Sequence, residues 1–230
     1  MNVLIVNGSP KGDKSNTLKL TKSFVKGMQK SKSINVTEIN IKTSEINHCL
    51  GCFSCWVKTP GQCVINDDMS SYIQQFVNAD LVIWSFPLYY FGMPSKVKAF
   101  LDRLLPTSKL GMYERSDGGI SHYKRYDLSN QKTVLITTYG FCDTKNNYEA
   151  LLKQFEIIYG KDLTKVICAE GELIKIPELK SKINQYLGYV EQAGNEYAEQ
   201  CQISANTQAK LSELFMPKEM FLNEINKHNL

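Results

Sequence analysis

Short runs of apolar residues recur along the chain, and a stretch with helical periodicity follows most of them. The predicted strands are residues 3–6, 34–41, 81–86, 133–138 and, as the weakest of the five, 166–169. The predicted helices are residues 17–29, 94–105, 148–159, 180–200 and one that starts at Asp67-Asp68-Met69, with one of the two aspartates as its N-cap. This alternation predicts an α/β fold with a parallel sheet and helices on both faces. Burial from both sides explains why the strands are apolar throughout.

Two segments do not fit this alternation. Residues 106–132 form a polar stretch with two adjacent glycines and three tyrosines. So long a loop is typically functional, and we expect a lid over the site of this chain or of a neighbour. Residues 203–230 carry many large apolar side chains, which predicts a C-terminal tail that docks on the domain formed by residues 1–202 or on a neighbouring chain.

Composition and charge narrow the functional classes. The chain has 230 residues, 43% of them hydrophobic and 22% charged, which is typical of a soluble globular protein. Its net charge of +4 is spread along the chain, without the basic stripe of a nucleic-acid-binding protein. No apolar run approaches the roughly 20 residues of a membrane span, and the first strand begins at the N-terminus without a basic leader. We therefore expect a cytoplasmic protein with neither a nucleic-acid nor a membrane partner.

In a doubly wound sheet, ligands bind beyond the carboxyl ends of the strands. Small polar residues fill the loop after the first strand, Asn7-Gly8-Ser9-Pro10-Lys11-Gly12-Asp13-Lys14-Ser15-Asn16-Thr17. Hydroxyls, exposed amides and the positive end of a helix dipole predict a phosphate-binding loop. The dinucleotide pattern G-x-G-x-x-G is absent, and the Walker pattern fails because only three residues separate Gly8 from Gly12. A capped turn without a ligand is the alternative.

Aromatic residues dominate the loop after the third strand, Pro87-Leu88-Tyr89-Tyr90-Phe91-Gly92. The proline directs the chain off the sheet, the flat rings offer a wall for a planar ligand, and the glycine lets the backbone approach it. The alternative is that these rings close the core. Asp102-Arg103, on the helix that follows, predicts a structural ion pair rather than a catalytic one.

The loop after the fourth strand begins Thr137-Thr138-Tyr139-Gly140. Its small hydroxyls and its glycine again expose backbone amides, and the Tyr139 ring is placed to stack on a planar ligand. Together the three loops predict one binding site at the carboxyl ends of neighbouring strands.

In this order and on this sheet, the three loops resemble those of the NAD(P)H-dependent FMN reductases of the flavodoxin-like fold. The resemblance rests on Gly8-Ser9-Pro10 with Ser15-Asn16-Thr17, and on the aromatic loop followed by Lys98 and Asp102-Arg103; it covers roughly residues 1–200. It implies a flavodoxin-like, doubly wound five-stranded parallel sheet that binds FMN. The FMN-binding residues that it implies are Ser9, Lys11, Ser15, Asn16, Thr17, Pro87, Leu88, Tyr89, Tyr90, Phe91, Gly92, Thr138, Tyr139 and Gly140.

Four of the seven cysteines lie within fifteen residues, in the pattern C-x2-C-x2-C-x7-C formed by Cys49, Cys52, Cys55 and Cys63. Disulfides are not expected in a reducing compartment, whereas closely spaced thiolates suit an iron–sulfur cluster or zinc. The pattern resembles that of the iron–sulfur flavoproteins, a branch of the same family in which such a motif holds one [4Fe–4S] cluster. Plain FMN reductases with the same loop and no metal are the alternative.

The predicted function is that of an FMN-dependent NAD(P)H oxidoreductase. Hydride passes from NADH or NADPH to flavin N5, and electrons pass on to a small-molecule acceptor such as a quinone, a nitro- or azo-aromatic compound or free flavin. Because the flavin carries the chemistry, no catalytic side chain is expected. The alternative is an electron carrier or redox sensor that works through the cluster. Since flavin edges in this fold are open on one side, we expect a homodimer or homotetramer.

Overall fold

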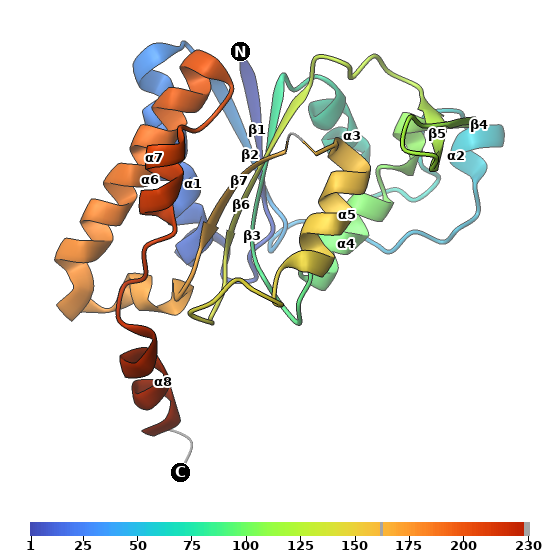
Figure 1. Cartoon of the computed structure of the whole chain (residues 1–230). Helices are drawn as coiled ribbons and strands as arrows, with labels where there is room; N and C mark the ends of the chain where they lie inside the picture. The colour runs from blue at the N-terminus through green and yellow to red at the C-terminus, as the bar shows by residue number, and fades with distance from the viewer. Residues whose placement is uncertain (162, 228–230) are drawn as a thin grey trace.

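The computed structural model describes residues 1–161 and 163–227 of the chain. Five parallel strands form its main sheet in the order β2-β1-β3-β6-β7 (Figure 1). Their bounds are β1 (Asn2–Asn7), β2 (Asn35–Asn40), β3 (Leu81–Pro87), β6 (Lys132–Thr138) and β7 (Thr164–Cys168). Each predicted strand overlaps one of these, and the strand order is that of flavodoxin-like sheets. The predicted fold class is therefore confirmed.

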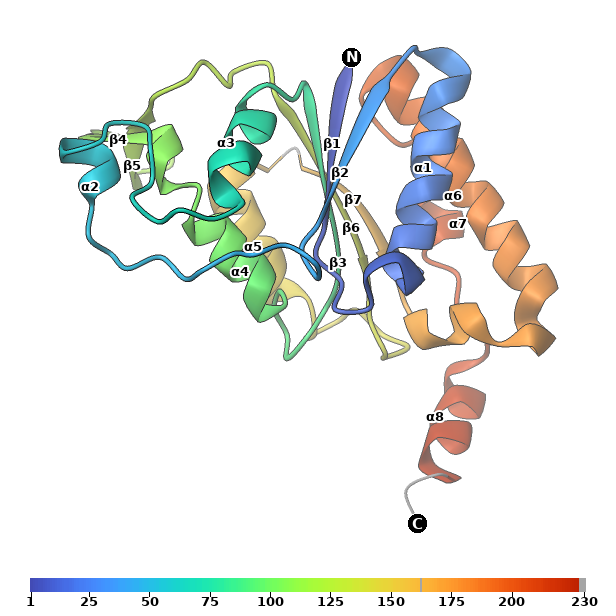
Figure 2. The ribbon, with the colours of Figure 1, turned by 180° about the vertical axis from the view of Figure 1, so that it is seen from behind.

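Helices cover both faces of the sheet (Figures 1 and 2). On one face lie α1 (Asn16–Ser31), α6 (Lys180–Gln200) and α7 (Ala205–Leu211). On the other lie α3 (Met69–Val77), α4 (Ser95–Asp102) and α5 (Glu149–Tyr159). The short α2 (Ser54–Val57) and the C-terminal α8 (Lys218–Lys227) stand outside these layers, and 3-10 turns occur at Gly12–Lys14, Leu105–Thr107, Gly171–Lys175 and Pro177–Leu179. None of the described helices is long and apolar enough to cross a bilayer.

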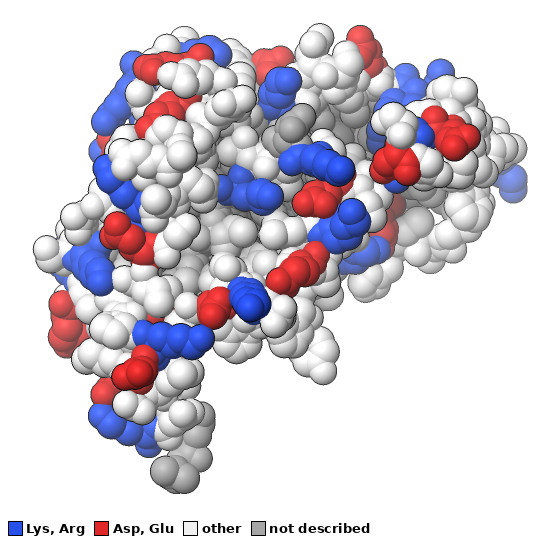
Figure 3. Space-filling model, in the orientation of Figure 1, with Lys and Arg blue, Asp and Glu red and all other residues white. Residues whose placement is uncertain are grey.

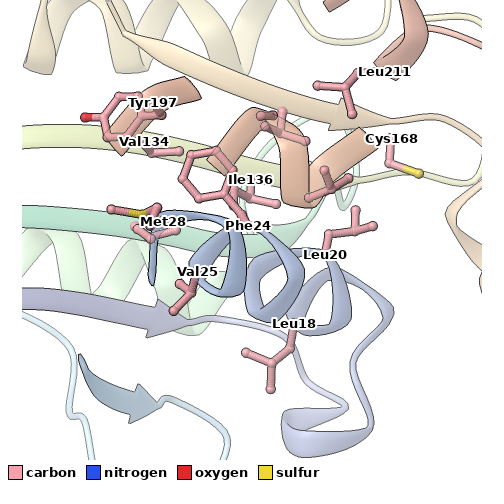
Figure 4. Close-up of a cluster of buried hydrophobic side chains, with 14 of the residues drawn as sticks. Leu18, Leu20, Phe24, Val25, Met28, Val134, Ile136, Cys168, Tyr197 and Leu211 are labelled. Atoms are coloured by element: carbon pink, nitrogen blue, oxygen red, sulfur yellow. The ribbon is translucent and has the colours of Figure 1, made fainter. Parts of the chain in front are cut away.

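One apolar core lies on each side of the sheet. The first fills the space between the sheet and α1, α6 and α7, and the side chains of Leu20 and Phe24 are fully buried in it (Figure 4). The second lies under α3, α4 and α5 around Trp84, whose ring meets those of Phe100 and Phe155 edge-on. Burial on both faces accounts for the apolar runs of β1 and β3, and the one polar residue inside β3, Ser85, is buried and accepts a hydrogen bond from the Thr21 hydroxyl at 2.7 Å.

Two glycines let α1 and α6 approach each other closely. A Cβ atom on Gly194 would lie 1.9 Å from the carbonyl oxygen of Phe24, and one on Gly27 would lie 1.8 Å from that of Glu191. Any side chain at either position would therefore push the two helices apart. The contact matters beyond the core because it holds α1, whose N-terminus borders the first predicted loop.

Residues 106–132 form a hairpin of β4 (Ser108–Glu114) and β5 (Ile120–Lys124) rather than an unstructured loop. The hairpin lies beside α2, away from the carboxyl edge of the sheet (Figure 1). Trp56 holds it there, because its indole donates to the Leu105 carbonyl oxygen at 3.1 Å and its ring contacts that of His122. The hairpin is thus not a lid over the carboxyl edge of its own chain.

The C-terminal tail divides into two parts. α7 and the residues after it pack on the first core, where Leu211 and Phe215 are buried. The buried carboxylate of Glu170 then accepts the backbone amides of Phe215 and Met216 at 2.6 and 3.3 Å. Beyond these hydrogen bonds, α8 extends past the carboxyl edge of the sheet (Figures 1 and 2), and it forms the projection at the bottom of the space-filling view in Figure 3.

Replacing Gly194 with alanine tests the contact between α1 and α6. The added methyl group meets backbone rather than a flexible side chain, so we expect G194A to lower the free energy of unfolding by about 1–3 kcal/mol, the usual range for overpacking. Gly188 on the same helix is the matched control, because nothing lies within 4 Å of its Cβ position. G188A should instead raise stability by up to about 1 kcal/mol through helix propensity. Urea denaturation followed by circular dichroism measures both, and equal effects would contradict the contact.

Candidate functional site

Parallel pairing brings the ends of β1, β3 and β6 to one edge of the sheet, the lower edge in Figure 1. Two hydrogen bonds join the loops that follow these strands. The amide of the buried Leu88 donates to the Thr138 carbonyl oxygen at 2.8 Å, and the hydroxyls of Thr17 and Thr138 lie 2.7 Å apart. Residues 8–17, 87–92 and 138–141 therefore form one continuous surface, called here the carboxyl-edge site.

The first loop of this site turns through a short 3-10 helix into α1. Ser15 is the N-cap of α1, and its hydroxyl accepts a backbone amide of the first turn at 3.2 Å. The amides of Asn16 and Thr17 have no intrahelical acceptor because they belong to that first turn. Lys11 is exposed and bonds Glu172 at 2.8 Å, and α1 has no acidic residue in its first turn. Ser9, Ser15, Asn16 and Thr17 are themselves buried. The first turn of α1 nevertheless has the free backbone amides and the positive helix end that favour an anion.

The second loop ends in a two-residue aromatic turn. The backbones of Tyr89 and Gly92 bond to each other in both directions at 2.9 Å, so Tyr90 and Phe91 stand at the turn itself. Both have a left-handed backbone, with φ values of 48° and 63°. Tyr90 is 100% exposed, and Phe91 is 47% exposed. Such backbone strain costs of the order of 1–3 kcal/mol per residue and is concentrated at functional sites.

The third loop places a different ring at the open edge from the one that the sequence predicted. Tyr139 is buried in the second core, where its ring meets that of Tyr148 edge-on, and burial raises the pKa of its hydroxyl. Phe141, which the sequence analysis missed, is half exposed and stacks on Phe91 with ring centroids 6.3 Å apart. The exposed Gly140 separates the two. The open edge is therefore lined by Phe91 and Phe141.

A fourth loop, after β7, was also missed. The side-chain amide of Asn16 donates to the Gly171 carbonyl oxygen at 2.7 Å, and the Gly171 amide donates to that of Tyr139 at 2.7 Å. A Cβ on Gly171 would lie 2.7 Å from that of Thr138, so this loop is pressed against the third. Ligands bind beyond the carboxyl ends of the strands in such a sheet, and this applies to β7 as well. The loop after β7, Ala169-Glu170-Gly171, has no anion-binding pattern, so the sequence gave no reason to select it.

The cysteines form a second candidate site, which we call the cysteine pocket. Its cavity has a volume of about 20 Å³, and its lining includes Cys49, Cys52, Cys55, Cys63 and Arg103. Cys55 is buried, Cys63 is half-buried and the other two cysteines are exposed. Burial and then the neighbouring thiols raise the pKa of Cys55, whereas hydrogen bonds at Ser54 lower the pKa of Cys52.

Four thiols around one cavity fit a thiolate-bound centre in their chemistry. The volume holds one ion or water molecule, which is less than a four-iron cube requires. No group of three or more His, Cys, Asp or Glu side chains is arranged to hold a metal ion in the described ranges. The backbone is left-handed at Gly51 and at Phe53, and Cys49 and Cys52 are exposed whereas Cys55 is buried, so the four thiols are not equally placed around the cavity.

The ion pair predicted between Asp102 and Arg103 is wrong. The Arg103 guanidinium bonds the Asp67 carboxylate at 2.7 and 2.8 Å, with both side chains buried, and it also donates to the Asn47 carbonyl oxygen at 2.8 Å. Asp102 pairs at the surface with Lys98, at 2.6 Å. Adjacent residues at a helix end point in different directions, which prevents the predicted pairing. Arg103 instead ties both ends of the cysteine loop to the end of α4.

Comparisons with known proteins bear on the family and the fold. The model of the family described as having a flavodoxin-like fold matches residues 1–161. An iron-sulfur flavoprotein of Archaeoglobus fulgidus is 33% identical over 106 residues, which are 46% of each protein. An FMN-dependent NADH:quinone oxidoreductase of Pseudoalteromonas atlantica is 28% identical over 127 residues, 53% of this chain and 62% of that protein. The chain thus spans roughly half the length of the curated relatives that it matches.

Solved structures share the fold. An FMN-dependent NADH-azoreductase from Bacillus anthracis in complex with FMN has a TM-score of 0.62 at 22% identity, covering 86% of this chain and 99% of that one. An NAD(P)H:quinone oxidoreductase from Methanothermobacter marburgensis has a TM-score of 0.61 at 15% identity, covering 85% and 95%. At these identities the likeness concerns the fold alone.

The buried Asp67–Arg103 pair predicts a pH dependence of stability. Burial alone would raise the pKa of Asp67, but its bonds to Arg103 and to the Asn47 amide outweigh burial and lower that pKa from 3.8 to about 2. The ionised carboxylate therefore contributes stability above pH 3.8, and this contribution is lost as the pH falls through about 2. D67N leaves the guanidinium buried without its counter-charge, so we expect about 3 kcal/mol of destabilisation at neutral pH.

Urea denaturation of D67N and the unmodified protein across this pH range measures the effect. The stability difference should shrink as the pH falls from 3.8 toward 2. D102N, which breaks only the exposed pair with Lys98, is the control and should track the unmodified protein. A difference for D67N that stays constant over the whole range would rule out the assigned cause.

Proposed function

Since the chain belongs to the family of proteins with the flavodoxin-like fold, we propose that it binds FMN at the carboxyl-edge site and is an FMN-dependent NAD(P)H oxidoreductase. NADH or NADPH supplies hydride, and a quinone, an azo- or nitro-aromatic compound or free flavin takes up the electrons. The names of the relatives support this proposal, because they include FMN-dependent NADH:quinone oxidoreductases and an azoreductase in complex with FMN.

One observation carries the proposal: the hydroxyl contact of 2.7 Å between Thr17 and Thr138. It joins an anion-binding helix end to the loop that stacks on the aromatic turn. FMN has a phosphate at one end and a flat tricyclic ring at the other, so a single molecule matches both parts of the surface. A capped turn without a ligand would explain the first loop, but it leaves the strained and exposed aromatic turn unexplained.

The phosphate end is assigned to the first loop. The hydroxyls of Ser9 and Ser15, the amides of Asn16 and Thr17, and the ammonium group of Lys11 supply its hydrogen bonds and positive charge. Lys11 must weaken its ion pair with Glu172 to reach the phosphate. This costs little free energy because that ion pair is exposed.

The ring end is assigned to the second and third loops. Tyr89, Tyr90 and Phe91 shield one side of the ring. The exposed Gly140 is assigned to its pyrimidine edge together with the adjacent Thr138, whose buried hydroxyl bonds that of Thr17. Donors at that edge favour negative charge on the ring system. FMN supplies the redox chemistry when it is bound, accepting and releasing hydride at N5. The chain binds and orients it, and no side chain has to transfer a proton.

Assembly and compartment complete the proposal. Tyr90, Phe91 and Phe141 leave a substantial apolar edge open to solvent, and edges of this kind are usually covered by a partner surface. A homodimer or homotetramer that covers this edge is part of the proposal. The seven free cysteines support a reducing, cytoplasmic environment.

The cysteine pocket favours a second candidate, an iron–sulfur flavoprotein that carries electrons or senses redox state. Its support is the convergence of four thiols on one cavity and the printed names of two relatives from Archaeoglobus fulgidus and Methanocaldococcus jannaschii. Cys49, Cys52, Cys55 and Cys63 would hold the [4Fe–4S] cluster, and zinc or a metal-free loop are the other states of the same pocket.

An absorption spectrum of anaerobically purified protein separates these candidates. A flavin spectrum with rapid NAD(P)H oxidation supports the reductase, and additional broad absorption with iron and sulfide near four per chain supports the cluster. A colourless protein whose melting temperature does not rise with added FMN would overturn the flavin proposal altogether.

Reversing the charge of Lys11 tests the phosphate end of the site. We expect K11E to weaken FMN binding by about 10- to 100-fold, since a charge-assisted hydrogen bond is worth about 1.5–3 kcal/mol. Riboflavin lacks the phosphate, so its affinity should not change. K26E makes the same charge change on α1, where Lys26 pairs with Glu191 of α6, and is the control. Flavin fluorescence titration measures all four affinities; equal losses for FMN and riboflavin would place the phosphate elsewhere.

A further inference from the structure

The C-terminal helix α8 packs little of its surface against its own chain. Its base is held, because Glu170 accepts the amides of residues 215 and 216 and Lys218 forms an ion pair with Asp143 at 3.1 Å. Beyond this base, Phe221 is the one buried residue of α8 in the described part of the chain. The helix projects from the body of the molecule, at the bottom of Figures 1, 2 and 3.

An apolar stripe on α8 needs a surface to cover it. A helix of ten residues is marginal in water by itself and is normally stabilised by packing an apolar face. Leu222 and Ile225 lie three positions apart, hence on one face, and are 44% and 47% exposed. Phe221 lies four positions before Ile225 and borders the same face. These three residues form the stripe, and two of them are still half open to solvent.

A second exposed apolar surface lies at the same end of the molecule. It consists of the rings of Tyr89, Tyr90, Phe91 and Phe141, which are 46% to 100% exposed, and is called here the aromatic edge. The base of α8 adjoins it, because Lys218 is bonded to Asp143, two positions after Phe141. From this base α8 extends outward, beyond the loops (Figures 1 and 2). One chain thus carries two neighbouring apolar surfaces that both lack a cover.

We propose that α8 of one copy packs its apolar stripe on the aromatic edge of a second copy, which returns the same contact. A two-fold axis makes this exchange symmetric and closed, so it covers both surfaces of both chains. Leu222 and Ile225 of the second copy then complete the carboxyl-edge site by shielding it from water. The inference rests on the proposed function for what that site binds, and on the exposed surfaces for the contact itself.

Continuity favours the aromatic edge as the surface that receives α8. Each α8 starts beside its own aromatic edge, so two exchanged helices and two edges adjoin one another around the axis. The hairpin β4–β5 also has exposed apolar side chains, but it lies away from the carboxyl edge (Figure 1). A helix docked there would leave the aromatic edge of both chains open to solvent.

The size of the exposed surfaces also fits a pair of chains. The exposed parts of the four rings amount to roughly 400–600 Å² per copy, since a whole aromatic side chain offers about 150–250 Å². A standard interface takes about 800 Å² from each partner. The aromatic edge alone falls short of that area, and the stripe of α8, which each copy also contributes, brings the contact toward it.

Charged substitutions on the two faces of α8 test the contact. We expect L222E/I225E to raise the dissociation constant of the dimer at least about 100-fold, because it removes two apolar side chains from each of two equal contacts. Glutamate is a strong helix former and both positions are half exposed, so the domain should stay folded. M220E/N223E adds the same charges on the opposite face of α8 and should leave the dimer unchanged. Sedimentation velocity measures all three proteins.

Mixing two defective variants shows which surfaces meet. F141E places a charge on the aromatic edge and should also dissociate the dimer. In an equimolar mixture of F141E with L222E/I225E, the intact α8 of the first variant meets the intact edge of the second, so one contact of the two is restored. We expect the mixture to associate at least about tenfold more tightly than either variant alone. If α8 closed over the edge of its own chain, mixing would restore nothing.

Each outcome decides the inference. Restored association in the mixture supports it. A monomeric unmodified protein, a dimer that L222E/I225E leaves intact, or a mixture no more associated than its components overturns it. The absorption spectrum decides the flavin proposal separately. A monomer that binds FMN leaves that proposal standing while the contact falls, whereas restored association without FMN binding overturns the flavin site and keeps the contact.

Discussion

The functional geometry depends on three parallel strands, β1, β3 and β6, pairing side by side in one direction. Only then do the loops after them emerge at the same edge, although they lie far apart along the chain. Backbone pairing sets this arrangement, and the bonds from Leu88 and Thr17 to Thr138 refine it. The close glycine contact between α1 and α6 adds to it, because it fixes the helix whose first turn borders the site.

A short helix connects the two candidate sites. α4 is capped by Pro94, just after the aromatic turn, and ends next to Arg103, at the cysteine pocket. Eight residues of α-helix span about 12 Å. The aromatic wall and the cysteine loop are therefore attached to opposite ends of one rigid element that is buried along one side.

Local patterns predicted the sheet, its helices and the three loops, because buried strands and capped helices leave periodic signals in neighbouring residues. Contacts between distant residues left no such signal. The partner of Arg103 lies 36 positions away at Asp67, so proximity in sequence pointed wrongly to Asp102. Whether Tyr139 or Phe141 lies at the open edge depends on the direction of the backbone after β6. The sequence carries no local pattern that indicates this direction. The hairpin of residues 108–124 has exposed faces on both strands, so it lacks the alternation that reveals a strand.

The two hydrogen bonds that hold the C-terminal tail to Glu170 have a practical consequence. Because they fix residues 215 and 216 under the sheet, α8 leaves the domain next to the open aromatic edge. The N-terminus lies at the opposite end of the strands, where its amino group donates to the Ser33 carbonyl oxygen. An affinity tag or fluorescent fusion appended after α8 would lie close to the proposed cofactor opening and to any neighbouring copy. The same label at the N-terminus would lie far from both.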